Sequence, residues 1–180
     1  GDYVIYGRIN AFKSYPNISV GGDYTALPSS FRVIEGGSPT GDLPALFNQD
    51  GITVNFSPVY VNRLGQTAAI EATVPLPVEQ EKVLSMDVTF DVKGPRGLSV
   101  GVYMWNFEKN TYDYIKSVPF ANGLTSGVIK LTSPYGKYIR EGVAKPVLRV
   151  INPQTVNAQP AKFVLQVDRL VLTGKAEEDN

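Results

Sequence analysis

Apolar and polar residues alternate along several stretches of this sequence, and this period of two constrains the fold more than any other feature. In residues 84–92, every even position is apolar, from Leu84 to Val92, and every odd position is polar, from Ser85 to Asp91. Successive residues of a β-strand point to opposite faces, so such a stretch buries one face and leaves the other polar. No segment shows a sustained helical period. The sequence therefore predicts an all-β protein.

Glycine and proline separate these stretches along the whole chain, with 17 Gly and 13 Pro in 180 residues. That spacing is typical of short strands joined by turns. We predict about ten strands in a jelly-roll-like, two-sheet antiparallel sandwich. The clearest hairpin turn is at residues 108–110, and residues 94–97 are predicted to link the two longest strands as a hairpin in the same way. The predicted strands are residues 3–12, 31–35, 52–56, 67–74, 84–93, 98–107, 111–117, 127–132, 147–151 and 163–173.

The segment between the first two predicted strands is rich in residues that favour turns, including Pro16, Gly21 and Pro28. We therefore expect it to be a linker. The resulting organisation has three parts. An N-terminal strand arm with its turn-rich linker covers residues 1–27, the β-sandwich covers residues 28–174, and a polar tail covers residues 175–180.

The composition excludes several classes of function. Cysteine and histidine are absent, which removes Ser-His-Asp triads, Cys-His dyads and zinc sites built on either residue. Lys+Arg and Asp+Glu both number 17, so the basic excess of a nucleic-acid-binding protein is missing. No apolar run is long enough to span a membrane. We expect a protein that is not an enzyme, binds no nucleic acid and needs no cofactor.

The chain begins at Gly1 rather than at methionine. One interpretation is a trimmed chain, and the other is a mature protein whose signal peptide was removed before a small residue. We expect the second, and therefore a secreted or cell-surface location.

Short motifs mark the chain from its first predicted turn onward: LPSSF at residues 27–31, GG at 36–37, GDL at 41–43, Leu46, Asp50, YMWNF at 103–107, Arg149 and VLQVDRL at 164–170. Through these motifs the chain, from residue 28 onward and across about four-fifths of its length, resembles the β-sandwich modules of large secreted bacterial surface proteins. The resemblance implies a jelly-roll or galactose-binding-like fold and a carbohydrate-binding type of architecture. Modules of this kind usually accompany other domains, whereas we expect this one to stand nearly alone, with an extra N-terminal arm.

The N-terminal arm alternates over ten residues, enough to extend about 33 Å as a strand. It is either the first strand of its own sandwich or a donor strand that pairs with a neighbouring subunit. A strand exchanged head to tail produces an open filament, in which the protein's partner is itself. One face of the arm, which would make the assembly contacts, consists of Tyr3, Ile5, Gly7, Ile9 and Ala11.

The predicted hairpin at residues 98–117 is apolar on both faces. Even positions from Leu98 to Met104 form one apolar face, and aromatic residues lie on the other. A two-layer sandwich buries only one face of each sheet, so the second face would contact a sugar, another subunit or further packing. The aromatic residues that could stack on a carbohydrate are Tyr103, Trp105, Phe107, Tyr112 and Tyr114.

Two weaker patterns complete the candidates. Asp87, Asp91 and Asp168 lie on predicted strands and could approach one another as a Ca²⁺ site, although no Asp-rich loop is present. Asn17 and Asn55 each begin an Asn-X-Ser triplet for N-glycosylation. No pair of carboxylates stands out as a glycosidase pair.

These observations favour a non-catalytic extracellular structural subunit that assembles into a filament or surface layer by donating residues 3–12 to a neighbour. The alternative is a carbohydrate-binding module that uses the aromatic platform of the hairpin.

Overall fold

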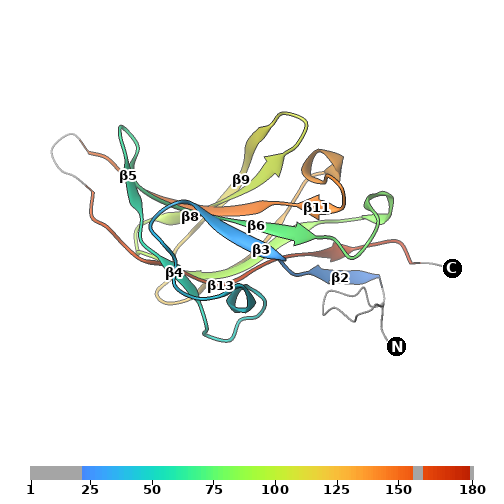
Figure 1. Cartoon of the computed structure of the whole chain (residues 1–180), viewed down its shortest axis with the longest axis horizontal. Helices are drawn as coiled ribbons and strands as arrows, with labels where there is room; N and C mark the ends of the chain where they lie inside the picture. The colour runs from blue at the N-terminus through green and yellow to red at the C-terminus, as the bar shows by residue number, and fades with distance from the viewer. Residues whose placement is uncertain (1–21, 156–159, 179–180) are drawn as a thin grey trace.

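The computed structural model describes residues 22–155 and 160–178, so the N-terminal arm, its assembly face from Tyr3 to Ala11, and Asn17 lie outside the described residues. Within the described ranges, two antiparallel sheets of five and seven strands pack face to face (Figure 1). The predicted all-β, two-sheet antiparallel sandwich is confirmed.

The strands of the smaller sheet are β2 (Asp23–Ala26), β4 (Val54–Phe56), β7 (Asp87–Lys93), β10 (Thr125–Lys130) and β13 (Leu165–Lys175). Their order is β10-β7-β13-β2, and β4 also pairs with β13. The strands of the larger sheet are β3 (Ser30–Glu35), β5 (Val59–Val61), β6 (Gly65–Pro75), β8 (Ser99–Asn106), β9 (Thr111–Pro119), β11 (Val143–Ala144) and β12 (Pro146–Pro153). Their order is β11-β6-β12-β8-β9, and β3 and β5 also pair with β6.

The core lies between the sheets and follows the alternation of the sequence. Met86 and the β7 residues Val88, Phe90 and Val92 are fully buried, as the even positions of residues 84–92 predict. Burying one such side chain stabilises the fold by about 1.5–3 kcal/mol. Leu84 differs from that prediction, because β7 begins only at Asp87 and 58% of the Leu84 surface is exposed. Opposite Phe90, β10 carries Gly127, where a Cβ atom would lie only 2.6 Å from Cζ of Phe90. The glycine therefore makes room for the largest fully buried side chain of the core.

The two apolar faces of the 98–117 hairpin separate in the structure. Val100, Val102 and Met104 of β8 are fully buried in the core. Tyr103 and Trp105 lie on the opposite face of the same strand and are only partly buried. The core therefore uses the even positions, and the outer face of the sheet carries the aromatic ones.

The predicted turn at residues 108–110 is confirmed and joins β8 to β9. The Asn106 side-chain oxygen accepts hydrogen bonds from the backbone N–H groups of Glu108 and Lys109. Asn110 adopts a left-handed conformation with φ of 56°, which asparagine tolerates better than most residues. By contrast, residues 94–97 join β7 of one sheet to β8 of the other, so this turn crosses the sandwich and forms no hairpin.

The sandwich begins earlier than the sequence predicted. The expected linker contains β2, which pairs with β13 and buries Tyr24 and Ala26. A four-residue strand shows too few alternations to stand out among glycines and prolines. At the other end, Lys175 still belongs to β13, and Ala176 is buried and bridges to Val83. The strand pairing therefore extends into both segments that we had assigned to the linker and the tail.

The only helical segments in the described part of the chain are three short 3₁₀ helices in the loops between strands. They are η1 (Leu43–Leu46), η2 (Gln80–Lys82) and η3 (Tyr135–Tyr138). Among the described residues, no helix has the length and apolar character needed to cross a membrane.

Candidate functional site

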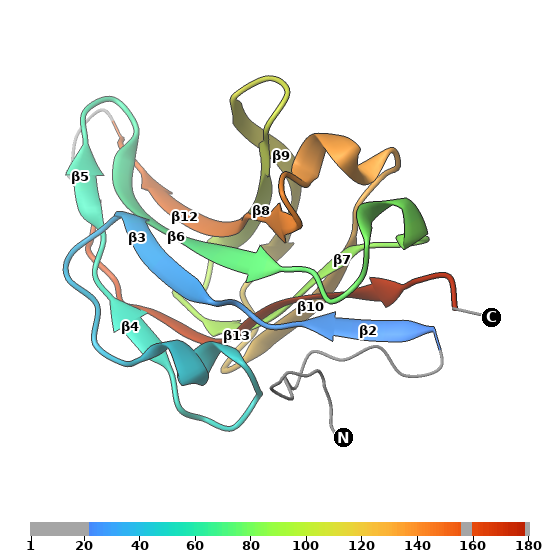
Figure 2. The same ribbon diagram turned by 45° about the vertical axis from the view of Figure 1, so that its right-hand side comes forward.

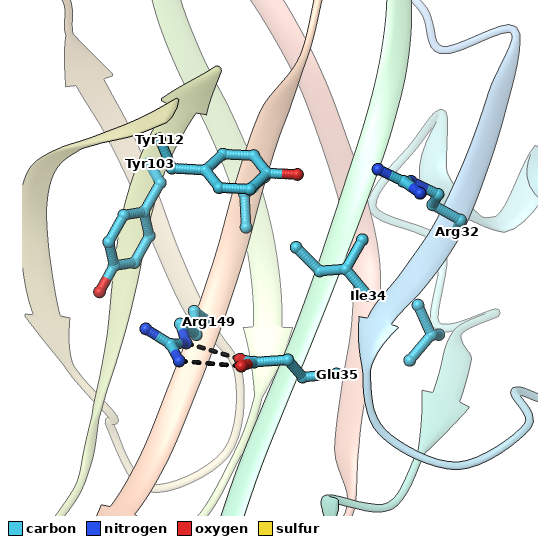
Figure 3. A pocket seen from close by; sticks show the side chains of 8 residues that line it. Arg32, Ile34, Glu35, Tyr103, Tyr112 and Arg149 are labelled. Carbon is cyan, nitrogen blue, oxygen red and sulfur yellow. Dashed lines mark hydrogen bonds and ion pairs between the residues drawn. The ribbon is translucent and has the colours of Figure 1, made fainter. Parts of the chain in front are cut away.

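The outer face of the seven-stranded sheet is hollowed. Figure 2 shows β5 and the β8–β9 hairpin curving away from the five-stranded sheet on either side of β6 and β12. Between β3 and the β8–β9 hairpin lies a cavity of about 460 Å³, lined by eight residues from β3, β8, β9 and β12 (Figure 3). The polar and aromatic ones among them are Arg32, Glu35, Tyr103, Tyr112 and Arg149.

One side of the hollow is formed by an ion pair that reaches across three strands. Strand register places Glu35 of β3 beside Ala69 of β6, and Ala69 beside Arg149 of β12. Because alanine is short, the Arg149 side chain reaches over it to Glu35. Arg149 Nε donates to Glu35 Oε1 at 2.6 Å, and Nη2 donates to Oε2 at 2.9 Å (Figure 3). Such a bidentate pair fixes both side chains in one geometry.

The other side of the hollow is organised by Glu71, whose side chain is only 4% exposed. Arg32 Nε donates to Glu71 Oε1 at 2.9 Å, and the Tyr112 hydroxyl donates to Oε2 at 2.5 Å. Figure 3 shows the Tyr112 hydroxyl pointing toward Arg32 across the strands between them. Burial, followed by the hydrogen bond to Glu71 and its charge, raises the pKa of Tyr112 to about 12. The phenol therefore stays protonated and keeps donating at neutral pH.

Four aromatic side chains form two cross-strand pairs beside the hollow. Trp105 and Tyr112 are register partners with ring centroids 4.8 Å apart and an interplanar angle of 71°. Tyr103 and Tyr114 are also register partners, at 5.4 Å and 65°. Both pairs have the edge-to-face geometry that aromatic rings prefer. We call Tyr103, Trp105, Tyr112 and Tyr114 the aromatic strip.

The structure thus brings together four of the five aromatic residues that the sequence singled out. Phe107 lies beyond the end of β8, and the Arg140 guanidinium covers its ring at 5.2 Å from the centroid. Tyr114 is the most open member of the strip, with 58% of its surface exposed. Gly101, two residues before Tyr103, leaves space for the Tyr103 ring, because a Cβ atom there would lie 2.9 Å from Cε1 of that ring.

The three aspartates considered for Ca²⁺ have separate surroundings. Asp91 is fully buried and accepts hydrogen bonds from Arg169 Nε, at 2.6 Å, and from the Ser126 hydroxyl. Asp168 accepts hydrogen bonds from two backbone N–H groups of the loop at residues 50–51. Asp87 pairs in register with Lys130. Among the described residues, no three acidic side chains form a group that could hold a metal ion.

Asn55 lies in β4, where its backbone bridges to Thr40 and pairs with Gln166. Its side-chain oxygen accepts a hydrogen bond from the Thr53 hydroxyl at 2.6 Å. Glycosylation at this position stays a prediction.

No sequence motif marks the polar residues of the hollow as a site. Glu71 and Arg149 each stand alone among apolar neighbours in strands that read as buried, at AIEA and VLRV. A charged side chain in a buried strand requires a partner. The two isolated charges could therefore have indicated ion pairs on this sheet. They do not identify the partners, because Arg32 and Glu35 lie more than 35 residues away in the chain.

No protein-family model matches this sequence, and no curated protein matches it. Among solved structures, the chain is similar to the carbohydrate-binding module TmCBM61 in complex with β-1,4-galactotriose, with 15% identity over 83% of this chain and 91% of that chain, and a TM-score of 0.47. It is also similar to a mutant of a family 29 carbohydrate-binding module, with 9% identity over 84% and 90% of the two chains and a TM-score of 0.46. A CBM29-2 mutant complexed with mannohexaose has 11% identity over 80% and 91%, and a TM-score of 0.43. With TM-scores below 0.5, these similarities carry no argument about function.

Proposed function

We propose that this protein is a non-catalytic carbohydrate-binding module whose ligand lies on the outer face of the seven-stranded sheet. The observation that carries the proposal is the aromatic strip beside a hollow of about 460 Å³. A volume of this size falls within the usual range of ligand sites, about 300–1,000 Å³.

The chemistry of the face suits a sugar. A pyranose ring has apolar C–H faces and a rim of hydroxyls, so it matches a surface that combines aromatic rings with fixed hydrogen-bonding groups. The strip supplies the aromatic surface. Arg149 and Arg32 supply N–H donors, and Glu35 supplies carboxylate acceptors.

The width of the face favours an oligosaccharide over a single sugar. The partners run from β3 through β6, β12 and β8 to β9, which is four strand spacings. At about 4.8 Å per spacing, the face is about 19 Å wide. We therefore propose that several consecutive sugar residues lie across the strands, between the aromatic strip and the Arg149–Glu35 pair. We place this binding outside the cell.

Binding to a glycan array, followed by calorimetry with the best oligosaccharide, tests the proposal. Trp105→Ala should weaken binding at least tenfold, because it removes the largest ring of the strip, which packs against Tyr112 at the hollow. Tyr60→Ala is the matched control, since Tyr60 is an exposed aromatic residue of β5 that belongs neither to the aromatic strip nor to the lining of the hollow. The absence of any bound glycan, or unchanged affinity in Trp105→Ala, would refute the proposal.

Self-assembly through residues 3–12 is a second candidate. Among the described strands, nine-residue β9 pairs only with β8, so it offers a free edge of about the same length as the arm. Deleting residues 1–13 should then abolish assembly and leave a folded monomer. Electron micrographs that show equal assembly of the full and the shortened chain would reject this candidate.

A further inference from the structure

We propose that Glu71 is a positioning residue of the glycan site, which holds Arg32 and Tyr112 in the geometry that binding requires without touching the ligand. The inference rests on the proposed function and assigns a role within the same face.

The contacts of Glu71 divide between two distant strands. Its Oε1 accepts a hydrogen bond from Arg32 of β3, the neighbouring strand. Its Oε2 accepts a hydrogen bond from the Tyr112 hydroxyl of β9, at the far edge of the sheet. Tyr112 also packs edge to face against Trp105. One carboxylate therefore connects the Arg32 wall of the hollow to the aromatic strip.

Burial separates the role of Glu71 from those of its partners. The Glu71 side chain is 4% exposed, whereas the Arg32 side chain is 68% exposed. A ligand on this face can reach Arg32 and Tyr112, which line the hollow, but Glu71 does not line it. Any effect of Glu71 on binding must therefore pass through the two side chains that it holds.

The Arg32 and Tyr112 side chains would lose a shared anchor without Glu71. Arginine has many rotamers, and an exposed arginine without its partner samples them freely. Each hydrogen bond to a charged group contributes more than a neutral one. The ligand would then have to order Arg32 and Tyr112 itself, which weakens binding although no ligand contact has been deleted.

Calorimetry with the oligosaccharide that binds the native protein tests this inference. Glu71→Ala should weaken binding about tenfold, and Glu71→Gln, which retains one acceptor, should weaken it about threefold. Asp91→Asn is the matched control, because Asp91 is an equally buried carboxylate that holds Arg169 on the other sheet. That variant should bind the glycan as the native protein does.

Non-additivity distinguishes positioning from a direct or merely structural role. In a background that carries Tyr112→Phe and Arg32→Met, Glu71→Gln should change affinity less than about twofold, because the groups it positions are gone. An equal loss in both backgrounds would overturn the inference, and so would native affinity in the single Glu71→Gln variant.

A spectroscopic measurement keeps the inference independent of the glycan. In protein labelled at the tyrosine ζ carbon, NMR titration should show a lower Tyr112 pKa in Glu71→Gln than in the native protein, since the charge and the strongest acceptor are lost. If no glycan binds but this pKa falls, the proposed function fails while the hold of Glu71 on Tyr112 stands. An unchanged Tyr112 pKa would show that Glu71 does not hold the ring.

Discussion

The two sheets carry hollows of nearly equal size, about 460 Å³ on the seven-stranded sheet and about 440 Å³ beside the five-stranded sheet. The two hollows differ in the aromatic rings that they offer to a ligand. The second hollow includes two tyrosines from different elements. The Tyr24 ring is buried and its hydroxyl donates to the Ser85 carbonyl at 2.7 Å, and Tyr135 of η3 is a single, partly buried ring. The first adjoins the four rings of the aromatic strip. Volume alone therefore does not mark the candidate site, whereas the two pairs of aromatic rings beside the first hollow do.

The outer faces differ in the same sense. On the five-stranded sheet, Asp91 is satisfied by Arg169 and Ser126, and the hydroxyls of Thr89 and Thr173 lie within hydrogen-bonding distance at 3.0 Å. These polar groups therefore hydrogen-bond to one another. On the seven-stranded sheet, the ion pairs border a hollow and keep part of their hydrogen-bonding capacity for a ligand. We therefore expect substitutions on one face to change stability and those on the other to change binding.

The largest expected effect is on stability, at the five-stranded sheet. Asp91→Ala leaves Arg169 without its buried partner and should destabilise the fold by about 3 kcal/mol. Urea denaturation measures the loss, and glycan affinity should stay at the native value. Asp23→Asn is the control. Its ion pair with Lys175 is exposed, so the loss of that pair should leave stability unchanged. Weakened glycan binding by the folded Asp91→Ala protein would break the division between the faces.

The next effect is on binding, at the aromatic strip. Tyr103→Ala removes a ring that both lines the hollow and packs against Tyr114. We expect affinity to fall about thirtyfold, or about 2 kcal/mol, as for a central aromatic contact. Tyr135→Ala, which alters a tyrosine of the second hollow, should leave affinity unchanged. Calorimetry on both variants provides the comparison, and equal losses would show that the two hollows do not differ in function.

A smaller effect concerns salt. The charged groups at the first hollow are two arginines and two glutamates that neutralise each other in pairs. If hydrogen bonds and stacking hold the ligand, affinity for a neutral glycan should change less than about twofold between 50 and 500 mM NaCl. A steep decrease in affinity with salt would instead indicate recognition of ligand charge.

The smallest effect is a pH dependence of stability at the second hollow. Burial raises the pKa of Asp87, and Lys130 opposes this shift only in part. Because the folded-state pKa exceeds the unfolded one, this group stabilises the fold at low pH, and that contribution is lost as pH rises through the folded pKa. Asp87→Asn should therefore raise Tm at pH 7 and leave it unchanged near pH 3. A lower Tm at pH 7 would contradict the sign.

Asp113 provides the opposite sign for comparison. Burial acts to raise its pKa, but hydrogen bonds from Asn106 and Tyr138 outweigh burial and lower it. Its stabilising contribution is therefore present above the unfolded pKa and lost as pH falls through the folded one. Asp113→Asn should lower Tm at pH 7, and the difference from the native protein should vanish in acid.

The sequence predicts the fold well wherever the alternation is long. Residues 84–93 and 98–107 show enough alternate positions for both strands and their buried faces to be recognised. The short strands β2, β5 and β11 have two to four residues each, too few to display a period of two. Their pairing depends on longer strands already in place, which is tertiary information.

The site is predictable only in part for the same reason. The aromatic strip lies on one hairpin. Local alternation therefore identifies all four of its members, because a hairpin that is apolar on both faces can bury only one of them in the core. The Arg32–Glu71–Tyr112 and Arg149–Glu35 contacts join residues far apart in sequence, and strand order decides them. The three aspartates illustrate the converse. Residue type suggested a shared site, whereas in the structure Asp91 and Asp168 each have their own hydrogen-bond partners, and among the described residues no three acidic side chains form a metal group.

The central claim is that a glycan binds to the aromatic strip of the seven-stranded sheet. The most direct measurement is an NMR titration of isotope-labelled protein with the oligosaccharide chosen on the array. We predict saturable shifts of the Trp105 indole N–H and of amides in β8, β9 and β12, with β2, β10 and β13 unaffected. Shifts confined to the five-stranded sheet, or no shift of the Trp105 indole at saturation, would contradict the claim.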